Sequence, residues 1–293
     1  MNWDDVRVFL SVARTGQILA AGRRLGLNHA TVARRLTSLE EDLSVKLFER
    51  STSGCILTDK GSRFLPRAEA IEAEVLAAEA EIADDEVSIS GTVRIGAPDG
   101  FGVAFLAPRL GQLTKKHPDL TVQLVPVPRS FSLSRREADI AITVERPEHG
   151  RLIARKLTDY SLGLYASRSY LDTFPPPKAL KDLKGHNLIG AVEDLIYSQA
   201  LNYAADFTKD WPARFEIASA LGQTEAVRAG AGIGVLHSFI ARSDPNLVRL
   251  LPEIEVKRAY WTVSHESTRP LRPVTAALEF LNDLVLSERE IFA

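Results

Sequence analysis

The sequence has few of the residues on which disulfide-rich domains and metal enzymes depend. Cys55 is the one cysteine among 293 residues, so neither a disulfide framework nor a Cys-x-x-Cys zinc site is available. The six histidines are scattered and lack the H-x-x-x-H or H-x-H spacing of a metal-ligand pair. The Gly-x-Ser-x-Gly turn that presents a hydrolase nucleophile is also absent. The sequence therefore disfavours metal-dependent and serine-dependent catalysis.

Long apolar runs are missing as well. No stretch approaches the ~20 apolar residues that span a membrane. The chain begins Met1-Asn2-Trp3-Asp4-Asp5, which is acidic and unlike the basic start of a secretory leader. We therefore expect a cytoplasmic protein with no membrane partner. The apolar fraction of 45% and the charged fraction of 25% are typical of globular chains, and the length suggests about two domains.

The chain also lacks a net positive charge, since 36 basic residues face 38 acidic ones. By itself this balance argues against a nucleic-acid partner, because phosphate binding depends on Lys and Arg. The charge is uneven, however: residues 1–66 carry ten basic and seven acidic side chains, while the remainder is net acidic. Arg23-Arg24 and Arg34-Arg35 lie close together within that first part. A basic module joined to an acidic one is compatible with DNA binding.

The first 60 residues show the pattern of a winged helix-turn-helix. Their apolar spacing and turn residues predict three helices and then two strands, over about 4–16, 18–25, 28–42, 46–50 and 55–58. The turn 26–28 joins the second and third helices into a helix-turn-helix, in which the later helix presents its first residues to the major groove. The alternative interpretation is a small helical bundle with surface arginines.

Several collinear stretches carry a resemblance to a known family. They are distributed over about sixty residues, at 9–16, 20–25, 27–36, 39–43, 47–50 and 57–61. These stretches resemble the start of LysR-type transcriptional regulators. His29, Ala30 and Ala33 depart from the residues that the family most often has there, which leaves the operator sequence open. Segments 135–142 and 150–157 resemble the same family, so the likeness extends along the whole chain.

The predicted DNA contacts lie at the start of the third helix and in the wing. Arginine is the best bidentate donor to guanine or phosphate, which favours Arg34 and Arg35, although a solvated helix face is an open alternative for Arg35. Arg50 and the Ser/Thr turn suit the DNA backbone or the adjacent minor groove. The predicted DNA-binding residues are Asn28, His29, Ala30, Thr31, Arg34, Arg35, Arg50, Ser51, Thr52 and Ser53.

A linker helix is predicted to follow, capped by Thr58 and beginning at Asp59. Its apolar residues alternate in steps of four and three, which is a heptad seam. The seam residues are Phe64, Ala68, Ile71, Val75, Ala78 and Ile82. We favour a dimer seam over a helix packed on its own chain, and the resemblance agrees, because this family dimerises through the helix and assembles to tetramers. The polar face, including Glu69, Glu72 and Glu74, is acidic and is expected to keep the linker away from DNA phosphates.

From residue 91 onward, strands and helices alternate, which predicts parallel strands with helices on the faces. The resemblance implies a two-lobed α/β domain of the periplasmic-binding-protein type. The fold class is therefore a multidomain α+β and α/β chain. The expected domains are a winged helix-turn-helix at 1–58, a linker helix at 59–88 and a regulatory domain at 89–293. Lobe one covers about 91–162 and 266–293, and lobe two about 163–265.

A small effector is expected between the lobes, because ligands of open α/β sheets bind at strand C-termini and helix N-termini. Asp99 stands where the family often has Ser or Thr binding an effector carboxylate. Either the effector is neutral, polyhydroxylated or cationic, or Asp99 caps its own helix. Arg146 suits an anionic effector, so the sign of the ligand charge stays open. The predicted effector-binding residues are Pro98, Asp99, Gly100, Phe101, Thr143, Glu145, Arg146, Tyr197, Gln223 and Thr224.

The predicted function is that of a DNA-binding transcriptional regulator, not an enzyme, without a cofactor. Its expected partners are promoter DNA, further copies of itself, a small-molecule effector and RNA polymerase. Closure of the lobes on the effector is expected to change the spacing of the DNA-binding pairs and the bend of the promoter. The alternative is a small-molecule-binding protein or α/β enzyme without a DNA function. For an enzyme, however, the glycine run 230–234 has the wrong order, because it follows a helix and leads into a strand.

Overall fold

The computed structural model describes residues 1–51, 54–82, 89–127, 133, 137–147, 150–208 and 210–292. By packing, the chain divides into two compact units. The first consists of Met1–Val87 with Ser132–Glu137 and His265–Arg272, and the second of Ser88–Phe131, Ala138–Ser264 and Pro273–Ala293. This division does not separate the linker helix from the first unit. The predicted division into three domains therefore stays a prediction.

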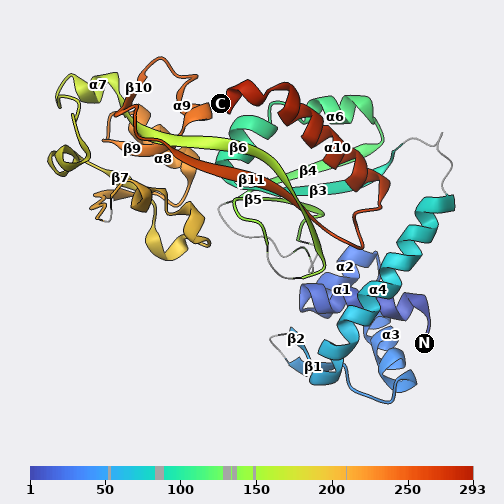
Figure 1. Cartoon of the computed structure of the whole chain (residues 1–293). Helices are drawn as coiled ribbons and strands as arrows, with labels where there is room; N and C mark the ends of the chain where they lie inside the picture. Colours follow the sequence, from blue (N-terminus) through green and yellow to red (C-terminus); the bar gives the residue numbers. More distant parts are fainter. Residues whose placement is uncertain are drawn as a thin grey trace. The chain divides into compact units, whose positions relative to one another are not determined.

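The first unit contains the predicted helices, hairpin and linker helix (Figure 1). Its elements are α1 (Trp3–Thr15), α2 (Ile18–Leu25), α3 (His29–Asp42), β1 (Phe48–Ser51), β2 (Gly54–Leu57) and α4 (Asp59–Ile82). Local chemistry fixes the ends. Gly16 and Gly26 end α1 and α2 with φ angles of 68° and 67°, a left-handed conformation that glycine adopts without a steric penalty. The Asn28 side chain accepts a hydrogen bond from the Thr31 amide at 2.7 Å and begins α3.

The core of this unit joins the linker helix to the helix-turn-helix. The Phe9 ring on α1 contacts the rings of Phe48 on β1 and Phe64 on α4, with centroid separations of 5.3 and 4.9 Å. Ala68, one turn beyond Phe64, is fully buried in the same cluster. Thr58 caps α4 as predicted, because its hydroxyl accepts a hydrogen bond from the Gly61 amide at 3.0 Å. The base of α4 is therefore part of the domain core.

The second unit is built on one mixed sheet of seven strands. Its strands are β3 (Gly91–Ala97), β4 (Leu120–Pro126), β5 (Ile140–Thr143), β6 (Leu152–Ser167), β9 (Gly234–His237), β10 (Leu247–Leu250) and β11 (Val256–His265). The order is β10-β6-β11-β5-β3-β4, and β9 also pairs with β6. As predicted, β3 pairs in parallel with β4 and β5. The expectation of parallel strands fails elsewhere, because β11 is antiparallel to β5, and β9 and β10 are antiparallel to β6.

Helices and a small second sheet complete this unit. The helices are α5 (Asp99–Phe101), α6 (Gly111–Lys116), α7 (Arg168–Leu171), α8 (Ala220–Arg228), α9 (Ser238–Ala241) and α10 (Arg272–Ser287). A π-helical turn, Gly102–Leu106, extends α5 toward α6. The small sheet pairs β7 (Ile189–Gly190) with β8 (Phe215–Glu216) in parallel. Between them the chain forms short 3₁₀ turns at Glu193–Leu195, Gln199–Leu201 and Tyr203–Asp206.

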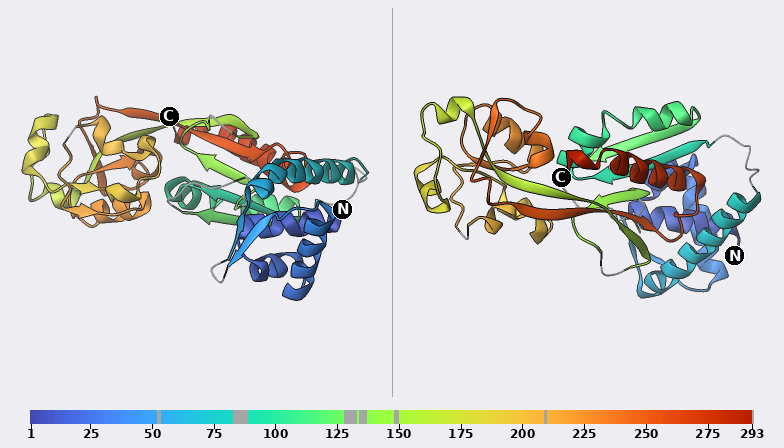
Figure 2. Two further views of the ribbon diagram at one scale, coloured as in Figure 1. Left: turned by 90° about the horizontal axis from the view of Figure 1, so that it is seen from below. Right: turned by 45° about the horizontal axis from the view of Figure 1, so that its top comes forward.

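Strands β6 and β11 connect two groups of elements (Figures 1 and 2). Lobe one holds β3, β4, β5, α5, α6 and α10, and in both figures α10 runs beside β3 and β4. Lobe two holds β7 to β10 and α7 to α9. The C-terminal half of β6 pairs within lobe two, while the C-terminal half of β11 pairs with β5 of lobe one. Two extended strands are thus the main covalent path between the lobes.

Candidate functional site

The first residues of α3 form an exposed edge. Asn28, His29, Ala30 and Arg34 are exposed, whereas Val32 and Leu36 of the same helix are buried. Arg34 makes no ion pair with any described residue, so its guanidinium is available for a ligand. Asn28 has a second role as the helix cap, because its oxygen is bonded to the Thr31 amide. Its amide nitrogen remains available as a donor.

Arg35 is held by the protein itself. Its Nη1 lies 3.0 Å from Oδ2 of Asp4 and 3.7 Å from Oδ1 of Asp5, both at the start of α1. These two carboxylates neutralise the guanidinium and direct it toward α1. The geometry favours a structural role for Arg35, although its DNA contact stays a prediction.

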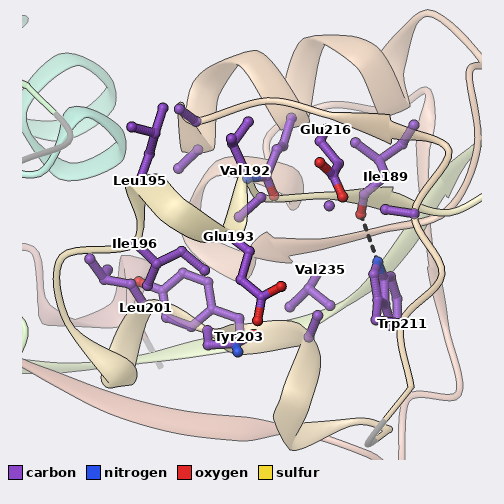
Figure 3. A pocket seen from close by; sticks show the side chains of 18 of the residues that line it. Ile189, Val192, Glu193, Leu195, Ile196, Leu201, Tyr203, Trp211, Glu216 and Val235 are labelled. Carbon is purple, nitrogen blue, oxygen red and sulfur yellow. Dashed lines mark hydrogen bonds between the residues drawn. The ribbon is translucent and has the colours of Figure 1, made fainter.

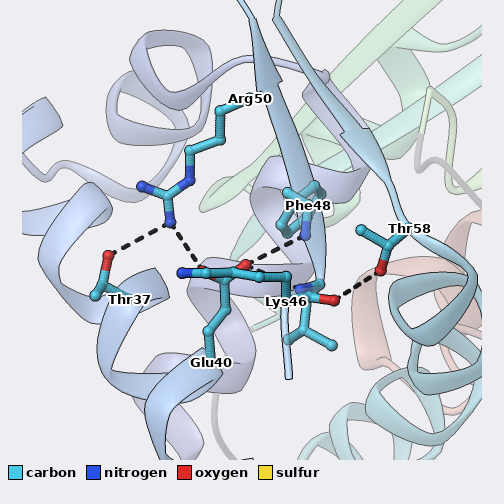
Figure 4. A network of polar contacts seen from close by, with 7 residues as sticks. Thr37, Glu40, Lys46, Phe48, Arg50 and Thr58 are labelled. Carbon is cyan, nitrogen blue, oxygen red and sulfur yellow. Dashed lines mark hydrogen bonds and ion pairs between the residues drawn. The ribbon is translucent and has the colours of Figure 1, made fainter. Parts of the chain in front are cut away.

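The wing is attached to α3 by the buried carboxylate of Glu40 (Figure 4). Glu40 is 2% exposed, and its Oε1 accepts hydrogen bonds from the amides of Leu47 and Phe48 at 2.9 and 3.2 Å. Its Oε2 accepts from Nζ of Lys46 at 2.9 Å and from Nη2 of Arg50 at 3.3 Å. Nothing in the sequence singles out Glu40, because a glutamate near the end of a helix has no distinguishing local signal.

Two of the predicted DNA-binding residues of the wing, Arg50 and Ser51, make hydrogen bonds within the protein. Arg50 bonds Glu40 and the Thr37 hydroxyl, so part of its donor capacity is engaged within the protein. The Ser51 hydroxyl donates to the Gly54 carbonyl across the wing at 3.2 Å. Thr52 and Ser53 lie outside the described residues. Burial alone would raise the pKa of Glu40, but the bonds from Lys46 and the two amides more than offset this and lower it.

The acidic face predicted for the linker is wrong at Glu69 and Glu72. Both are buried. Glu72 forms a bidentate ion pair with Arg14 of α1, with nitrogen–oxygen distances of 3.0 and 2.6 Å. The two side chains are 7% and 9% exposed. Glu74 alone of the three is exposed, so the acidic surface is smaller than predicted.

The predicted dimer seam divides into two parts. Phe64 and Ala68 pack into their own domain core, as the alternative interpretation required. Ile71 and Val75 are half-buried and Ala78 is exposed, so an apolar strip continues beyond the core. The Ile82 side chain lies outside the described part of the structure. Only this upper part of the seam is left to contact another copy.

A cavity of about 320 Å³ opens between lobe one and lobe two. Of the predicted effector-binding residues, Pro98, Asp99, Gly100, Tyr197 and Gln223 line it. The other five do not. Phe101 packs on Tyr260 with ring centroids 4.5 Å apart, and the Thr224 hydroxyl donates to the Ala220 carbonyl within α8.

The remaining three predicted residues lie at the end of β5 and directly after it, outside the cavity lining. The Thr143 hydroxyl donates to the Glu145 carbonyl at 2.6 Å, and the Glu145 carboxylate accepts from the Ser198 hydroxyl at 2.7 Å. The Arg146 guanidinium lies 6.0 Å from the Trp261 ring centroid. Arg146 is therefore not placed to meet an anion in this cavity.

Asp99 joins the two lobes. Its Oδ2 accepts hydrogen bonds from the Ser219 hydroxyl at 2.6 Å and from the Leu221 amide at 3.1 Å. Both donors lie at the N-terminus of α8, in lobe two. Of the two alternatives for Asp99, the cap of its own helix is not formed, since the carboxylate caps a helix of the other lobe instead.

Several lining residues escaped the sequence analysis, notably Glu193, Tyr203, Trp211, Glu216 and His237. Figure 3 shows the two glutamates among apolar side chains and the bond from Trp211 Nε1 to the Ile189 carbonyl, 3.0 Å. His237 is 4% exposed. Burial lowers its pKa to about 4 even though Asp99 acts in the opposite direction, so the ring is neutral at pH 7.

The described residues contain neither a cluster suited to a metal ion nor a helix suited to a membrane. No cluster of three or more His, Cys, Asp or Glu side chains there is arranged to hold a metal ion. Within the same residues, every helix is too short or too polar to cross a membrane.

Comparison with known proteins gives matches over the whole chain. Residues 3–62 match the model of the bacterial regulatory helix-turn-helix protein, lysR family, and residues 87–285 match the LysR substrate binding domain. The transcriptional activator TtdR of Escherichia coli is 27% identical over 287 residues, covering 94% of this chain and 91% of the relative. The transcriptional regulator CrgA of Neisseria meningitidis is 28% identical over 253 residues, covering 86% and 84%.

Solved structures agree in fold. The structure of CrgA, a LysR-type transcriptional regulator, aligns with a TM-score of 0.60 at 26% identity and covers 97% of this chain and 98% of the other. A full-length OxyR variant from Pseudomonas aeruginosa aligns with a TM-score of 0.72, covering 97% of each chain. At 17% identity the latter shows a shared fold only.

Proposed function

The chain belongs to the LysR family of bacterial helix-turn-helix regulators, and from this premise we propose that it binds promoter DNA as a dimer under the control of a small molecule. The observation that carries the proposal is the exposed start of α3. There His29, Ala30 and Arg34 are exposed, while the opposite face of the helix is buried. In a helix-turn-helix this edge enters the major groove. The cavity between the lobes is the proposed effector site.

Arg34→Ala is expected to weaken binding to the promoter beside the protein's own gene by about tenfold, because Arg34 is an exposed arginine without an internal ion pair. If Arg34 contacts a phosphate, the slope of log K against log salt falls by about one. Fluorescence anisotropy over a salt series measures both quantities. Arg214→Ala, an exposed arginine of lobe two, serves as the matched control. Unchanged affinity and slope in Arg34→Ala would contradict the assignment.

In the proposed dimer, the contact between copies is the upper part of the α4 seam, around Ile71, Val75 and Ala78. Small and β-branched residues at heptad spacing favour close approach of two helices. A dimer places two α3 helices on a two-fold symmetric operator, which matches the spacing requirement of helix-turn-helix proteins. Pairing of such dimers gives the proposed tetramer.

Val75→Glu is expected to weaken dimerisation by about 2 kcal/mol, roughly thirtyfold, because it buries a carboxylate in the seam of each copy. Analytical ultracentrifugation over a dilution series gives the dissociation constant. The control is Glu74→Gln, which changes an exposed residue beside the seam. A dissociation constant in Val75→Glu equal to that of the control would exclude this seam.

In this proposal the protein acts in the cytoplasm, where the promoter and RNA polymerase are its partners. Effector binding in the cavity changes how the two lobes are arranged relative to each other. This rearrangement changes the spacing of the DNA-binding pairs. No enzymatic turnover, metal or cofactor is assigned.

A further inference from the structure

The effector cavity has an unusual charge balance for a site that takes a metabolite. We propose that it binds an organic cation, an amine or quaternary ammonium compound with an apolar body. This inference rests on the proposed function, because it takes the cavity to be the effector site. Three independent features carry it: the occupied N-terminus of α8, the charges of the lining, and the aromatic groups around a buried histidine.

The first feature is that the natural anion position is already filled. A helix N-terminus attracts an anion through its free amides and its dipole. At the N-terminus of α8, the Leu221 amide donates to Asp99 and the Gly222 amide donates to the Ser219 hydroxyl at 3.0 Å. The Ser219 hydroxyl in turn donates to Asp99. A carboxylate of the chain therefore sits where an anionic ligand binds in other α/β proteins, and it repels a second anion.

The second feature is the charge of the lining. Asp99, Glu193, Asp210 and Glu216 line the cavity, whereas no lysine or arginine is among its lining residues within the described chain. The carboxylates of Glu193 and Glu216 make no hydrogen bond or ion pair with any described residue, and Figure 3 shows them in the lining. Unpaired carboxylates in a concave site attract cations and disfavour anions.

The third feature is the set of aromatic groups. Tyr197, Tyr203 and Trp211 line the cavity, and aromatic faces bind ammonium groups through their negative quadrupole. His237 is more than nine-tenths buried and lines the same cavity, and its imidazole has no hydrogen-bond partner among the described residues. A neutral imidazole keeps a lone pair that accepts a hydrogen bond from an ammonium group. Carboxylates with aromatic faces form the combination that a cation requires.

The apolar part of the ligand follows from the remaining lining. Leu195, Ile196 and Leu201 also line the cavity and are drawn in Figure 3, so part of the lining offers hydrocarbon contacts. The volume of about 320 Å³ is at the lower end of the range for small-molecule sites. Such a site fits a small amine with a hydrocarbon or aromatic body better than a long polyamine.

The test uses three probes that share a phenethyl group and differ in charge: phenethylamine, phenethyl alcohol and hydrocinnamate. Choline is a fourth probe that represents quaternary cations. Thermal unfolding of the full chain is followed with each, because a ligand specific to the folded state raises the melting temperature. We expect phenethylamine or choline to raise it most and hydrocinnamate not to raise it. The proposal is overturned if hydrocinnamate raises the melting temperature more than both cations do. It is also overturned if neither cation raises the melting temperature.

Variants locate the effect in the cavity. Glu193→Gln and Glu216→Gln each remove one unpaired charge, and each is expected to weaken binding of the stabilising cation about tenfold while leaving the response to phenethyl alcohol unchanged. Glu253→Gln is the matched control, since Glu253 is exposed in lobe two and does not line the cavity. Equal affinities in all three variants overturn the assignment.

Promoter binding is measured on the same preparations, which separates the two levels of inference. If the chain binds promoter DNA and only the carboxylate probe stabilises it, the cation class is wrong and the proposed function stands. If the chain fails to bind promoter DNA, the proposed function fails, whichever probe occupies the cavity.

Discussion

Glu40→Ala is expected to destabilise the wing and the end of α3 by about 4 kcal/mol. The change leaves the amides of Leu47 and Phe48 without acceptors, and each buried unpaired amide costs about 1–3 kcal/mol. It also removes the partner of Lys46 and Arg50. Glu40→Gln keeps one carbonyl oxygen for the amides, so about half of the loss is expected. Hydrogen exchange at residues 47–57 measures the local opening free energy.

The control for this prediction is Glu41→Ala, an exposed glutamate on the same helix, for which a change within about 0.5 kcal/mol is expected. Equal exchange rates in Glu40→Ala and Glu41→Ala would contradict the prediction. A pH series provides a second test, the pH dependence of the stability that Glu40 contributes. Since the folded state lowers the pKa of Glu40, its contribution is present above the ordinary carboxyl pKa and is lost as the pH falls through the folded-state pKa. Glu40→Gln is expected to lack this acid-dependent component.

Glu72→Ala is expected to cost about 4 kcal/mol, because it leaves the Arg14 guanidinium buried without its carboxylate. Arg14 Nε already has no hydrogen-bond partner among the described residues, so little else compensates the charge. The pair ties α1 to α4, and its loss therefore loosens the linker helix from the helix-turn-helix. Hydrogen exchange along residues 59–75 reports the opening.

A double-mutant cycle distinguishes pairing from general damage. Arg14→Met combined with Glu72→Leu removes both charges and fills a similar volume, so it is expected to recover most of the stability that Glu72→Ala loses. Glu74→Ala, on an exposed position of the same helix, is the control. Strictly additive losses at Arg14 and Glu72 would show that the two side chains do not interact.

Local chemistry made the first unit predictable. The end of α2 and the start of α3 are predictable because Gly26 and Asn28 act on backbone groups within four residues of themselves. The ion pairs of Arg35 and Glu72 cannot be predicted from neighbouring residues in this way. Their partners, Asp4 and Arg14, lie 31 and 58 residues away in the sequence, and nothing in the helical spacing indicates which charges meet. Long-range pairing is a property of the packed domain.

The second unit shows the same limit more strongly. The sequence pattern predicts a strand only over Leu162–Ala166, yet β6 begins ten residues earlier at Leu152. That first half is exposed or half-buried and has no clear period. The cavity residues Glu193 and Tyr203 lie on 3₁₀ turns of three or four residues, which are too short to leave a periodic pattern. The sequence indicates Asp99 as a residue of the cleft, but nothing in it indicates that Ser219 and Leu221 at the start of α8 are its partners.

The Asp99 contacts have a consequence for how sensitively the protein responds. The carboxylate bridges the lobes through the Ser219 hydroxyl and the Leu221 amide, and these two hydrogen bonds favour a closed arrangement of the lobes. Apparent affinity equals intrinsic affinity multiplied by the fraction of molecules in the binding-competent state. An effector that fits the closed arrangement therefore loses little affinity to reorganisation, whereas one that requires the lobes to part must first break two hydrogen bonds. One internal carboxylate thus biases the concentration at which the switch responds.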